Sequence, residues 1–406
     1  MDFQIFQLPN GIRFIHQYNK SAVAHCGLLI NSGTRDEFPH EHGLAHFIEH
    51  VLFKGTSKRK TYHINSRLED VGGEINAYTS KEETAIHATV LKTDFEKAVE
   101  LIADIAFNSI FPEKELIKEK EVILDEINSY KDSPADLIFD DFEDLLFNET
   151  SLGRNILGTK KHLKSFNRDA VLKFIERTYN TDQMVFSSVG KIKPDKALAI
   201  VHKYFGSLPA NFRSYSRDLL LPYTPFKKQV SKNTYQTHFI LGNRGYAFSD
   251  DKRIPLLLLT NILGGPAPNS RLNYTLREKY GLTYNVEANY TPYTDTGVFS
   301  IYLGTDKSNF ERSRELVIGE MKKLQSQRLG IMQLHRAKKQ VLGQLAISAE
   351  SNEQLMLTNA KSLLVYNSVD KMDLITERIS SISGDKLMEI ANEIFEENAL
   401  STLLYT

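Results

Sequence analysis

The chain has 406 residues, of which 41% are hydrophobic and 25% are charged, and its formal net charge is -1. This composition is typical of a soluble globular protein, and the length predicts two or more domains. The near-neutral charge excludes the clustered basic excess of a nucleic-acid-binding protein, and no apolar run in the sequence is long enough to span a membrane. Cys26 is the only cysteine, which excludes an intrachain disulfide and a zinc site built from thiolates.

The first half of the chain mixes strands and helices. Short β-branched or aromatic segments bounded by Gly and Asn predict strands at 11–18 and 22–33. Residues 43–55 predict a helix ended by Gly55, because apolar side chains recur there at intervals of three and four. The next predicted elements are a helix at 62–73, a strand, a turn and a strand across 74–91, a helix at 94–108, a long charged helix at 112–134 and a buried strand at 184–192.

A connector separates this half from a second one. Residues 208–232 contain three prolines and scattered charges, which is typical of a linker. We place an N-terminal domain at 1–215, the linker at 216–232 and a C-terminal domain at 233–406. The second half repeats the succession of the first, with predicted strands at 235–246, 283–292 and 297–305, helices at 254–265 and 271–281, and then long helices.

The predicted fold class is therefore α+β. We expect two homologous α/β domains of about 200 residues, each a mostly antiparallel sheet packed with helices. The halves share little sequence identity, so the evidence for this duplication is the order of the elements.

Two histidines and a glutamate stand out in the predicted helix at 43–55. His46 and His50 are four residues apart, with Glu49 between them. Positions i and i+4 share a helix face, so both imidazoles can reach one Zn²⁺. Glu49 then lies beside the metal, where it can act as a general base. The order His-x-x-Glu-His is the inverzincin signature, although a pair of histidines satisfied by other side chains would have the same sequence.

A catalytic zinc needs a third protein ligand and one open position. Glu119 and Glu126 are seven residues apart in the predicted helix at 112–134, so they share a face. Glu126 can bind the metal while Glu119 supports the site. Taken by itself, a helix of this kind is more often a solvated charged face.

Taken together, these segments resemble the pitrilysin-type zinc peptidases, the inverzincin family that includes insulin-degrading enzyme and the mitochondrial processing peptidase. The chain looks most like the short-chain branch related to the β-subunit of the processing peptidase. The resemblance covers most of the chain and rests on "NSGTRDE", "GLAHFIEHVLFKGTSKR", "GGEINAYTSKEETAIHATVLKTDFEKAVELIADI" and "EKEVILDEI", which follow the family's order and spacing.

The resemblance implies one Zn²⁺ per chain, bound by His46, His50 and Glu126. Glu126 follows His50 by 76 residues, which is the family's spacing for its third ligand. Glu49 is implied as the base that activates a water molecule on the metal. Glu119 stands where the family keeps another glutamate, and we count it with Glu49 among the catalytic residues.

The resemblance also implies how substrate is bound. The segment "SRLNYTLREKYGLTYNV" resembles the part of the family that places a paired Arg and Tyr, here Arg277 and Tyr284, at the far wall of an enclosed chamber. A strand edge at Asn76, Ala77 and Tyr78 would pair with the substrate backbone. An ordinary edge strand would look the same in the sequence.

These features predict a zinc-dependent endopeptidase that cleaves short unstructured peptides inside a chamber. A homodimer is expected because the chain keeps both the zinc motif and the Arg–Tyr pair. The alternative is a peptide-binding or structural core-type subunit of a heteromeric peptidase complex. We expect no nucleic-acid or membrane partner, and a cytoplasmic location because the sequence does not start with a basic segment followed by an apolar one.

Overall fold

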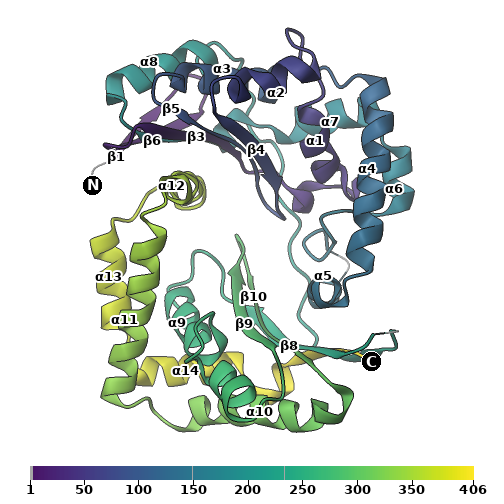
Figure 1. The fold of residues 1–406 in the computed structure, drawn as a ribbon, viewed down its shortest axis with the longest axis vertical. Coiled ribbons are helices and arrows are strands. Elements are labelled where there is room, and N and C mark those ends of the chain that lie inside the picture. Colours follow the sequence, from purple (N-terminus) through teal and green to yellow (C-terminus); the bar gives the residue numbers. More distant parts are fainter. Residues whose placement is uncertain (1–2, 149, 233) are drawn as a thin grey trace. The chain divides into compact units, whose positions relative to one another are not determined.

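The computed structural model describes residues 3–148, 150–232 and 234–406. The chain forms two compact units, each built on one β-sheet with helices packed against it (Figure 1). The first unit contains the chain up to Ser129 together with Arg154–Leu219 and Ile347–Val369, and the second contains Tyr130–Gly153, Leu220–Ala346 and Asp370–Thr406.

Among the described residues, the first sheet has six strands, in the spatial order β1 (Phe3–Gln7), β2 (Arg13–Tyr18), β6 (Met184–Gly190), β3 (Val23–Ile30), β5 (Thr84–Leu91) and β4 (Glu74–Thr79). β2 and β6 run parallel, and the other neighbouring pairs are antiparallel. Alternate residues of β3 serve opposite faces: Ala24, Cys26 and Leu28 lie in the main core, and Leu29 lies in a smaller core on the other face. β4 pairs only with β5 within the described sheet, so it is an edge strand.

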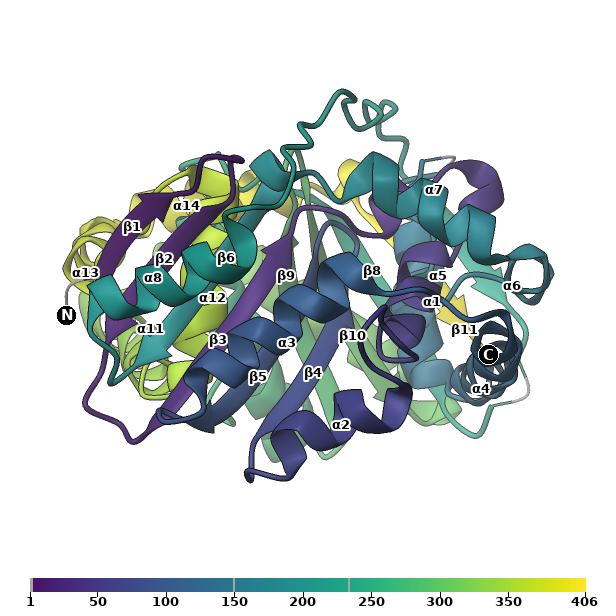
Figure 2. The same cartoon turned by 90° about the horizontal axis from the view of Figure 1, so that it is seen from above.

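Helices cover both faces of the first sheet. α3 (Phe95–Asn108) packs on β3 and β5, and α8 (Pro194–Phe205) packs on β2, as Figure 2 shows from above. α12 (Asn352–Tyr366) lies on the opposite face, against β6 and β3 (Figure 1). α1 (Leu44–Leu52) and α2 (Thr61–Glu69) reach the edge strand β4. The main core therefore lies between the sheet and α3, whose apolar residues recur at helical spacing and are buried.

In the described part of the second unit, the sheet has five strands, in the order β7 (Lys227–Val230), β11 (Ser401–Tyr405), β8 (Thr237–Gly245), β10 (Gly297–Thr305) and β9 (Asn285–Pro292). β7 and β11 run parallel, and the other pairs are antiparallel. α9 (Arg253–Gly264) packs on β9, and α14 (Gly384–Ile394) packs on β8 and on α10 (Phe310–Ser326). Both sheets thus confirm the predicted α+β class with mostly antiparallel pairing.

The other α-helices of the described residues are α4 (Glu113–Lys131), α5 (Pro134–Leu146), α6 (Lys160–Ser165), α7 (Arg168–Thr178), α11 (Ile331–Ser348) and α13 (Met372–Ser381). The helix predicted at 271–281 is a π-helix, Asn273–Lys279. Every strand and helix predicted from the sequence has a counterpart, whereas β1, β7 and β11 were not predicted. None of the helices in the described ranges combines the length and apolar character needed to cross a membrane.

The two sheets have the same topology. We number five strands of each unit by their order in the chain, starting from β2 in the first unit and from β7 in the second. Across each sheet, these strands then lie in the order first, fifth, second, fourth and third. In both, the first and fifth strands are the parallel pair. Shared order and shared direction support the internal duplication that the sequence indicated, because many other arrangements of five strands are possible.

Each unit contains a helix from the other half of the sequence. α5 precedes the predicted linker but packs on β8 and β11, where Phe142 and Leu146 are buried. α12 follows the linker but packs on β6 and β3, where Ala360 and Leu363 are buried. These strand pairs are equivalent, since each is the second and fifth strand of its unit. The predicted linker, 216–232, includes β7, and the compact units are not continuous in sequence.

Candidate metal centre

Helix α1 holds two imidazole rings at the border of the main core. Six apolar residues of the helix are buried and fix its orientation: Leu44, Ala45, Phe47, Ile48, Val51 and Leu52. His46 and His50 project together from the helix, with ring centroids 4.6 Å apart. The spacing of four residues therefore brings the two rings side by side, as predicted.

The N-terminus of α1 is held by a buried carboxyl group. Gly43 has a φ of 95°, and a Cβ atom there would lie 2.7 Å from the Cα atom of Gly158, so only glycine fits. Gly43 has no side chain to cap the helix. Instead Glu37 accepts hydrogen bonds from the backbone N–H groups of Gly43, at 2.9 Å, and Ala45, at 2.8 Å. These bonds fix the first turn of α1, which carries His46.

The third member of the site comes from α4. Oε2 of Glu126 lies 3.8 Å from Nε2 of His46 and 3.6 Å from Nε2 of His50. One ligand atom from each of the three residues lies within 4.8 Å of the others, and no other such group occurs in the described part of the chain. In a tetrahedral zinc site with Zn–N and Zn–O distances of about 2.0–2.2 Å, ligand atoms are about 3.3–3.5 Å apart. The three residues therefore fit Zn²⁺ after small side-chain movements.

The charge states of the site also suit a metal cation. Burial, together with the neighbouring His50, lowers the pKa of His46 to about 4, so the imidazole is neutral at pH 7 and Nε2 can offer a lone pair. Nδ1 of His46 is buried and has no hydrogen-bond partner among the described residues. Burying this ring with an unpaired Nδ1 has a free-energy cost, and binding of a metal cation at Nε2 would offset it.

Glu119 lies behind His50. Nδ1 of His50 is 3.0 Å from Oε1 of Glu119, and Nζ of Lys54 is 2.7 Å from Oε2 of the same carboxylate. A carboxylate accepts the proton on Nδ1, and Nε2 is directed toward Glu126. Glu119 thus contacts a metal-site imidazole and orients it, which agrees with the supporting role inferred from its spacing.

Glu49 lies between α1 and the edge strand. Burial raises the pKa of the Glu49 carboxyl group, and its neighbours Thr79 and His50 oppose that rise. Thr79 is the last residue of β4. The candidate base is therefore next to one end of the strand proposed to bind substrate.

The edge strand β4 contains the predicted substrate-binding residues Asn76, Ala77 and Tyr78. Ala77 packs against the main core, and Tyr78 packs against the smaller core on the opposite face. Asn76 is exposed. Because β5 occupies only one side of β4, the backbone groups on its other side can pair with an added strand.

Arg277 and Tyr284 belong to the second unit, whereas the metal-site residues belong to the first. Arg277 lies in the π-helix, and its Nε donates to Oε1 of Glu278 at 3.0 Å. Tyr284 precedes β9 and is 91% exposed. Within either compact unit, the structure therefore does not join this pair to the metal centre.

Sequence analysis did not assign functions to Glu37 or Lys54. Lys54 follows His50 by four residues, so helix spacing was a usable signal for its place near the site. Glu37 lies in the "NSGTRDE" segment, but its bonds to the start of α1 depend on the path of the intervening loop. No local pattern predicts that path.

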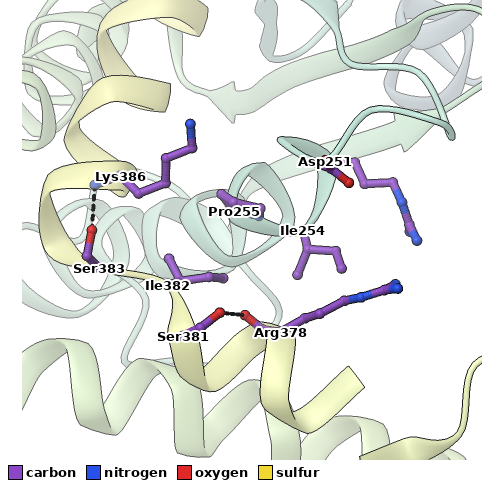
Figure 3. Close-up of a pocket in the computed structure, with 9 residues that line it drawn as sticks. Asp251, Ile254, Pro255, Arg378, Ser381, Ile382, Ser383 and Lys386 are labelled. Atoms are coloured by element: carbon purple, nitrogen blue, oxygen red, sulfur yellow. Dashed lines mark hydrogen bonds between the residues drawn. The ribbon is translucent and has the colours of Figure 1, made fainter. Parts of the chain in front are cut away.

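A separate pocket of about 320 Å³ lies in the second unit, between the start of α9 and the segment that joins α13 to α14 (Figure 3). Ile254, Pro255 and Ile382 form its apolar wall. Two of its cations have carboxylate partners: Arg378 is 2.6 Å from Asp370, and Lys386 is 2.8 Å from Glu389. The residues that line it include no His, Cys or Glu, so the pocket has a different chemistry from the metal centre.

Comparison with protein families agrees with the geometry of both units. Residues 13–160 match the family described as insulinase (peptidase family M16), and this range contains His46, His50 and Glu126. Residues 165–341 match the peptidase M16 inactive domain, and this range contains Arg277 and Tyr284.

Individual relatives cover almost the whole chain. A protein of Bacillus subtilis named uncharacterized zinc protease YmxG is 33% identical over 401 residues, which are 98% of this chain and 97% of the relative. The β-subunit of the mitochondrial-processing peptidase of Saccharomyces cerevisiae is 26% identical over 413 residues, covering 97% of this chain and 89% of that protein.

The fold is shared with solved structures. The crystal structure of a protease from Helicobacter pylori superposes with a TM-score of 0.93 at 20% identity, covering 100% of this chain and 99% of that one. A peptidase M16 inactive domain from Pseudomonas fluorescens also gives a TM-score of 0.93, at 19% identity. Together with the full-length sequence relatives, these findings confirm the resemblance noted in the sequence: the chain belongs to peptidase family M16 and is a metalloprotease.

Proposed function

We propose that the protein is a zinc endopeptidase that hydrolyses extended, unstructured peptides, with one Zn²⁺ per chain held by His46, His50 and Glu126. The observation that carries this proposal is the convergence of their three ligand atoms within 4.8 Å. When bound there, Zn²⁺ would supply Lewis acidity, which polarises a peptide carbonyl and lowers the pKa of water.

Two carboxylates beside the metal ligands have separate roles, proton transfer for Glu49 and orientation of His50 for Glu119. Glu49 takes the proton of the attacking water and delivers it to the leaving amine. It lies beside the ligands and next to the end of β4, whereas Glu119, the other carboxylate beside a ligand, is paired with His50 and Lys54. Glu119 keeps His50 in the tautomer whose Nε2 can bind a metal, through the 3.0 Å contact to Nδ1.

Substrate binds by adding a strand to β4. Backbone hydrogen bonds to an edge strand require an extended peptide and depend little on its side chains. The contact between Glu49 and Thr79 supports this placement, because a peptide lying along β4 passes the candidate base at the end of the strand. A folded protein cannot present its backbone in this way without local unfolding.

The active form is proposed to be a homodimer that encloses the site. Arg277 of a second copy would hold a substrate carbonyl, and Tyr284 of that copy would donate its hydroxyl to the oxyanion of the tetrahedral intermediate. Support comes from the 91% exposure of Tyr284, which leaves its hydroxyl available to a ligand or partner. Two copies would bring two zinc centres into one chamber.

Hydrolysis of a quenched fluorescent peptide by the purified chain tests this function. We expect zinc-dependent cleavage that a chelator abolishes and that one equivalent of Zn²⁺ per chain restores. In the same assay, a folded globular protein should resist cleavage while its denatured peptides are digested. Activity that survives complete metal removal would overturn the zinc assignment, and equal rates on folded and denatured substrate would overturn the enclosed site.

A further inference from the structure

The connector residues 212–218 turn alternate side chains into the first unit. Arg213, Tyr215 and Arg217 are partly buried, whereas the residues between and beside them are exposed. This period of two is typical of an extended chain that lies along a surface. In this part of the sequence the first unit ends at Leu219. The last residues before the chain leaves the unit are therefore attached to it by three long side chains.

The three side chains converge on the carboxylate of Asp36, which is fully buried. The guanidinium of Arg217 binds it in two places, with Nε 3.0 Å from Oδ1 and Nη2 2.9 Å from Oδ2. The hydroxyl of Tyr215 donates to Oδ1 at 3.1 Å, and Nη2 of Arg213 lies 3.9 Å from the same oxygen. Two parallel N–H donors fix both the distance and the orientation of a carboxylate.

Arg217 also holds a second segment, the 80–83 turn that joins β4 to β5. Its Nη2 donates to the backbone carbonyl oxygen of Glu82 at 2.9 Å, and its Nη1 lies 3.3 Å from Oε1 of Glu82. Arg35 binds the same Oε1 at 2.6 Å. One guanidinium from the connector thus bridges Asp36 and the turn that follows β4.

The two bridged segments lie directly against each other. The backbone N–H group of Thr34 donates to the carbonyl oxygen of Ser80 at 3.2 Å. The N–H group of Arg35 donates to the carbonyl oxygen of Lys81 at 2.7 Å. A Cβ atom on Gly33 would lie 2.6 Å from that oxygen of Lys81, so the close approach requires glycine. Arg217 therefore spans a junction of two backbones.

Each segment at this junction leads to a group of the proposed active site. Asp36 is followed by Glu37, whose carboxylate holds the first turn of α1. The 80–83 turn follows Thr79, the last residue of β4, which adjoins Glu49. The position of α1 relative to the end of β4 thus depends on the junction that Arg217 bridges.

We propose that Arg217 is a positioning residue that fixes the start of α1 to the end of β4 and so places Glu49 against a peptide paired with that strand. This role rests on the proposed function, because the group positioned is the candidate base. The metal ligands come from α1 and α4, neither of which contains a residue that Arg217 contacts, so zinc should bind without the bridge.

Substitution of Arg217 tests this role. Arg217→Lys keeps a cation near Asp36 but lacks the planar fork that binds two segments at once. We expect kcat to fall by about tenfold in Arg217→Lys and about 10²-fold in Arg217→Ala, because misplacement by about 1 Å can have that effect. KM and zinc content should stay close to those of the unsubstituted protein. Arg217→Ala leaves a buried carboxylate without its main partner, so Arg217→Lys decides the outcome if the alanine variant does not fold.

Arg59→Lys is the matched control. Arg59 is a largely buried arginine of the same unit that binds two carboxylates of α3, Glu100 at 2.7 Å and Asp104 at 2.6 Å. The control should lose stability and keep kcat at a temperature at which both variants are folded. An unchanged kcat in Arg217→Lys overturns the positioning role, and so does an equal fall in Arg217→Lys and Arg59→Lys.

Amide hydrogen exchange separates failure of the bridge from failure of the proposed function, since it needs no substrate. In Arg217→Lys the amides of Arg35, Gly43 and Ala45 should exchange about tenfold faster, whereas those of α3 should not change. Arg59→Lys should give the reverse pattern. Faster exchange at the three amides supports the bridge even if no peptide is hydrolysed. Unchanged protection there overturns it even if zinc-dependent hydrolysis is found.

Discussion

The two units share a strand topology but differ in the helix that follows the second strand. In the first unit this helix is α1, with the sequence LAHFIEHVL, and in the second it is α9, with the sequence RIPLLLLTNILG. Both helices bury apolar residues, but α9 has no histidine and no acidic residue. The duplicated scaffold thus provides a helix in the same place twice, and three side chains of α1 with one from α4 distinguish the metal-binding copy.

The next segments of the two units differ in a related way. The first unit continues through α2 to the edge strand β4, and the second continues through the π-helix to the edge strand β9. π-helical turns are uncommon and are frequent at functional sites. Arg277 lies in this turn and Tyr284 just before β9, so both residues proposed to bind substrate come from the region of the second unit that is equivalent to α2 and the start of β4.

The largest effect that we expect comes from removing one metal ligand, because α1, like α9, would then lack a complete set of ligands. His50→Ala or Glu126→Gln leaves two protein ligands, too few for a stable catalytic zinc site, so both metal and hydrolysis should be lost. Glu119→Gln should keep zinc but weaken its binding by about 10-fold to 100-fold, because Glu119 only orients His50.

Metal analysis after dialysis against a competing chelator measures these differences. Glu121→Gln is the control, since Glu121 is an exposed carboxylate on the same helix. Full zinc retention by Glu126→Gln, combined with zinc loss by Glu119→Gln, would show that the third ligand has been misassigned.

Glu49→Gln tests a second difference between α1 and α9, because it removes the candidate base and leaves the three metal ligands unchanged. The amide cannot accept a proton, so kcat should fall by about 10²-fold to 10⁴-fold or more while zinc stays bound. Steady-state hydrolysis and zinc content are measured on the same preparation. A variant with stoichiometric zinc and near-normal turnover would exclude Glu49 as the base.

The third prediction concerns whether the two kinds of unit act together across a dimer. Tyr284→Phe should lower kcat by about 10²-fold to 10³-fold, as expected for loss of one oxyanion donor. If the residues act between chains, exchange of subunits between Glu49→Gln and Tyr284→Phe dimers creates one intact site in each mixed dimer. Activity should then return to about one quarter of normal, since half the dimers are mixed and half their sites are intact.

Each single variant remixed with itself is the control for the exchange. Native mass spectrometry of isotopically labelled subunits establishes that mixed dimers have formed. A fully exchanged mixture that stays inactive would place Glu49 and Tyr284 in the same chain's site, or show that the protein does not act as this dimer.

The sequence predicted that His46, His50 and Glu126 come together, because its signals are local. His46 and His50 follow helix periodicity, and Glu126 follows a family spacing, so each could be placed without knowing the tertiary structure. Glu37 could not be placed in this way, because it reaches α1 through a loop. β1, β7 and β11 are short, and their pairing depends on partners far away in the chain.

The packing of α5 in the second unit and of α12 in the first unit could not be predicted from the sequence either. The apolar positions of α5 and α12 predict amphipathic or buried helices, but they do not identify which sheet each helix covers. Ile138 and Phe142 pack with β8 and β11, which begin about 100 and about 260 residues later in the chain, and Leu363 packs with strands from the first half. Only the tertiary contacts establish this arrangement.

The packing of α12 on the sheet of the first unit has a consequence for synthesis on the ribosome. β2, β3, β5 and β6 have all been translated once residue 190 is added, but α12 ends at Tyr366. Until then the face that contains Ile15, Leu29 and Val185 lacks its own helical cover and exposes apolar surface. Since domains generally fold as units during translation, the first unit cannot complete its packing before most of the second has been made, and the nascent chain has to be protected from aggregation during that interval.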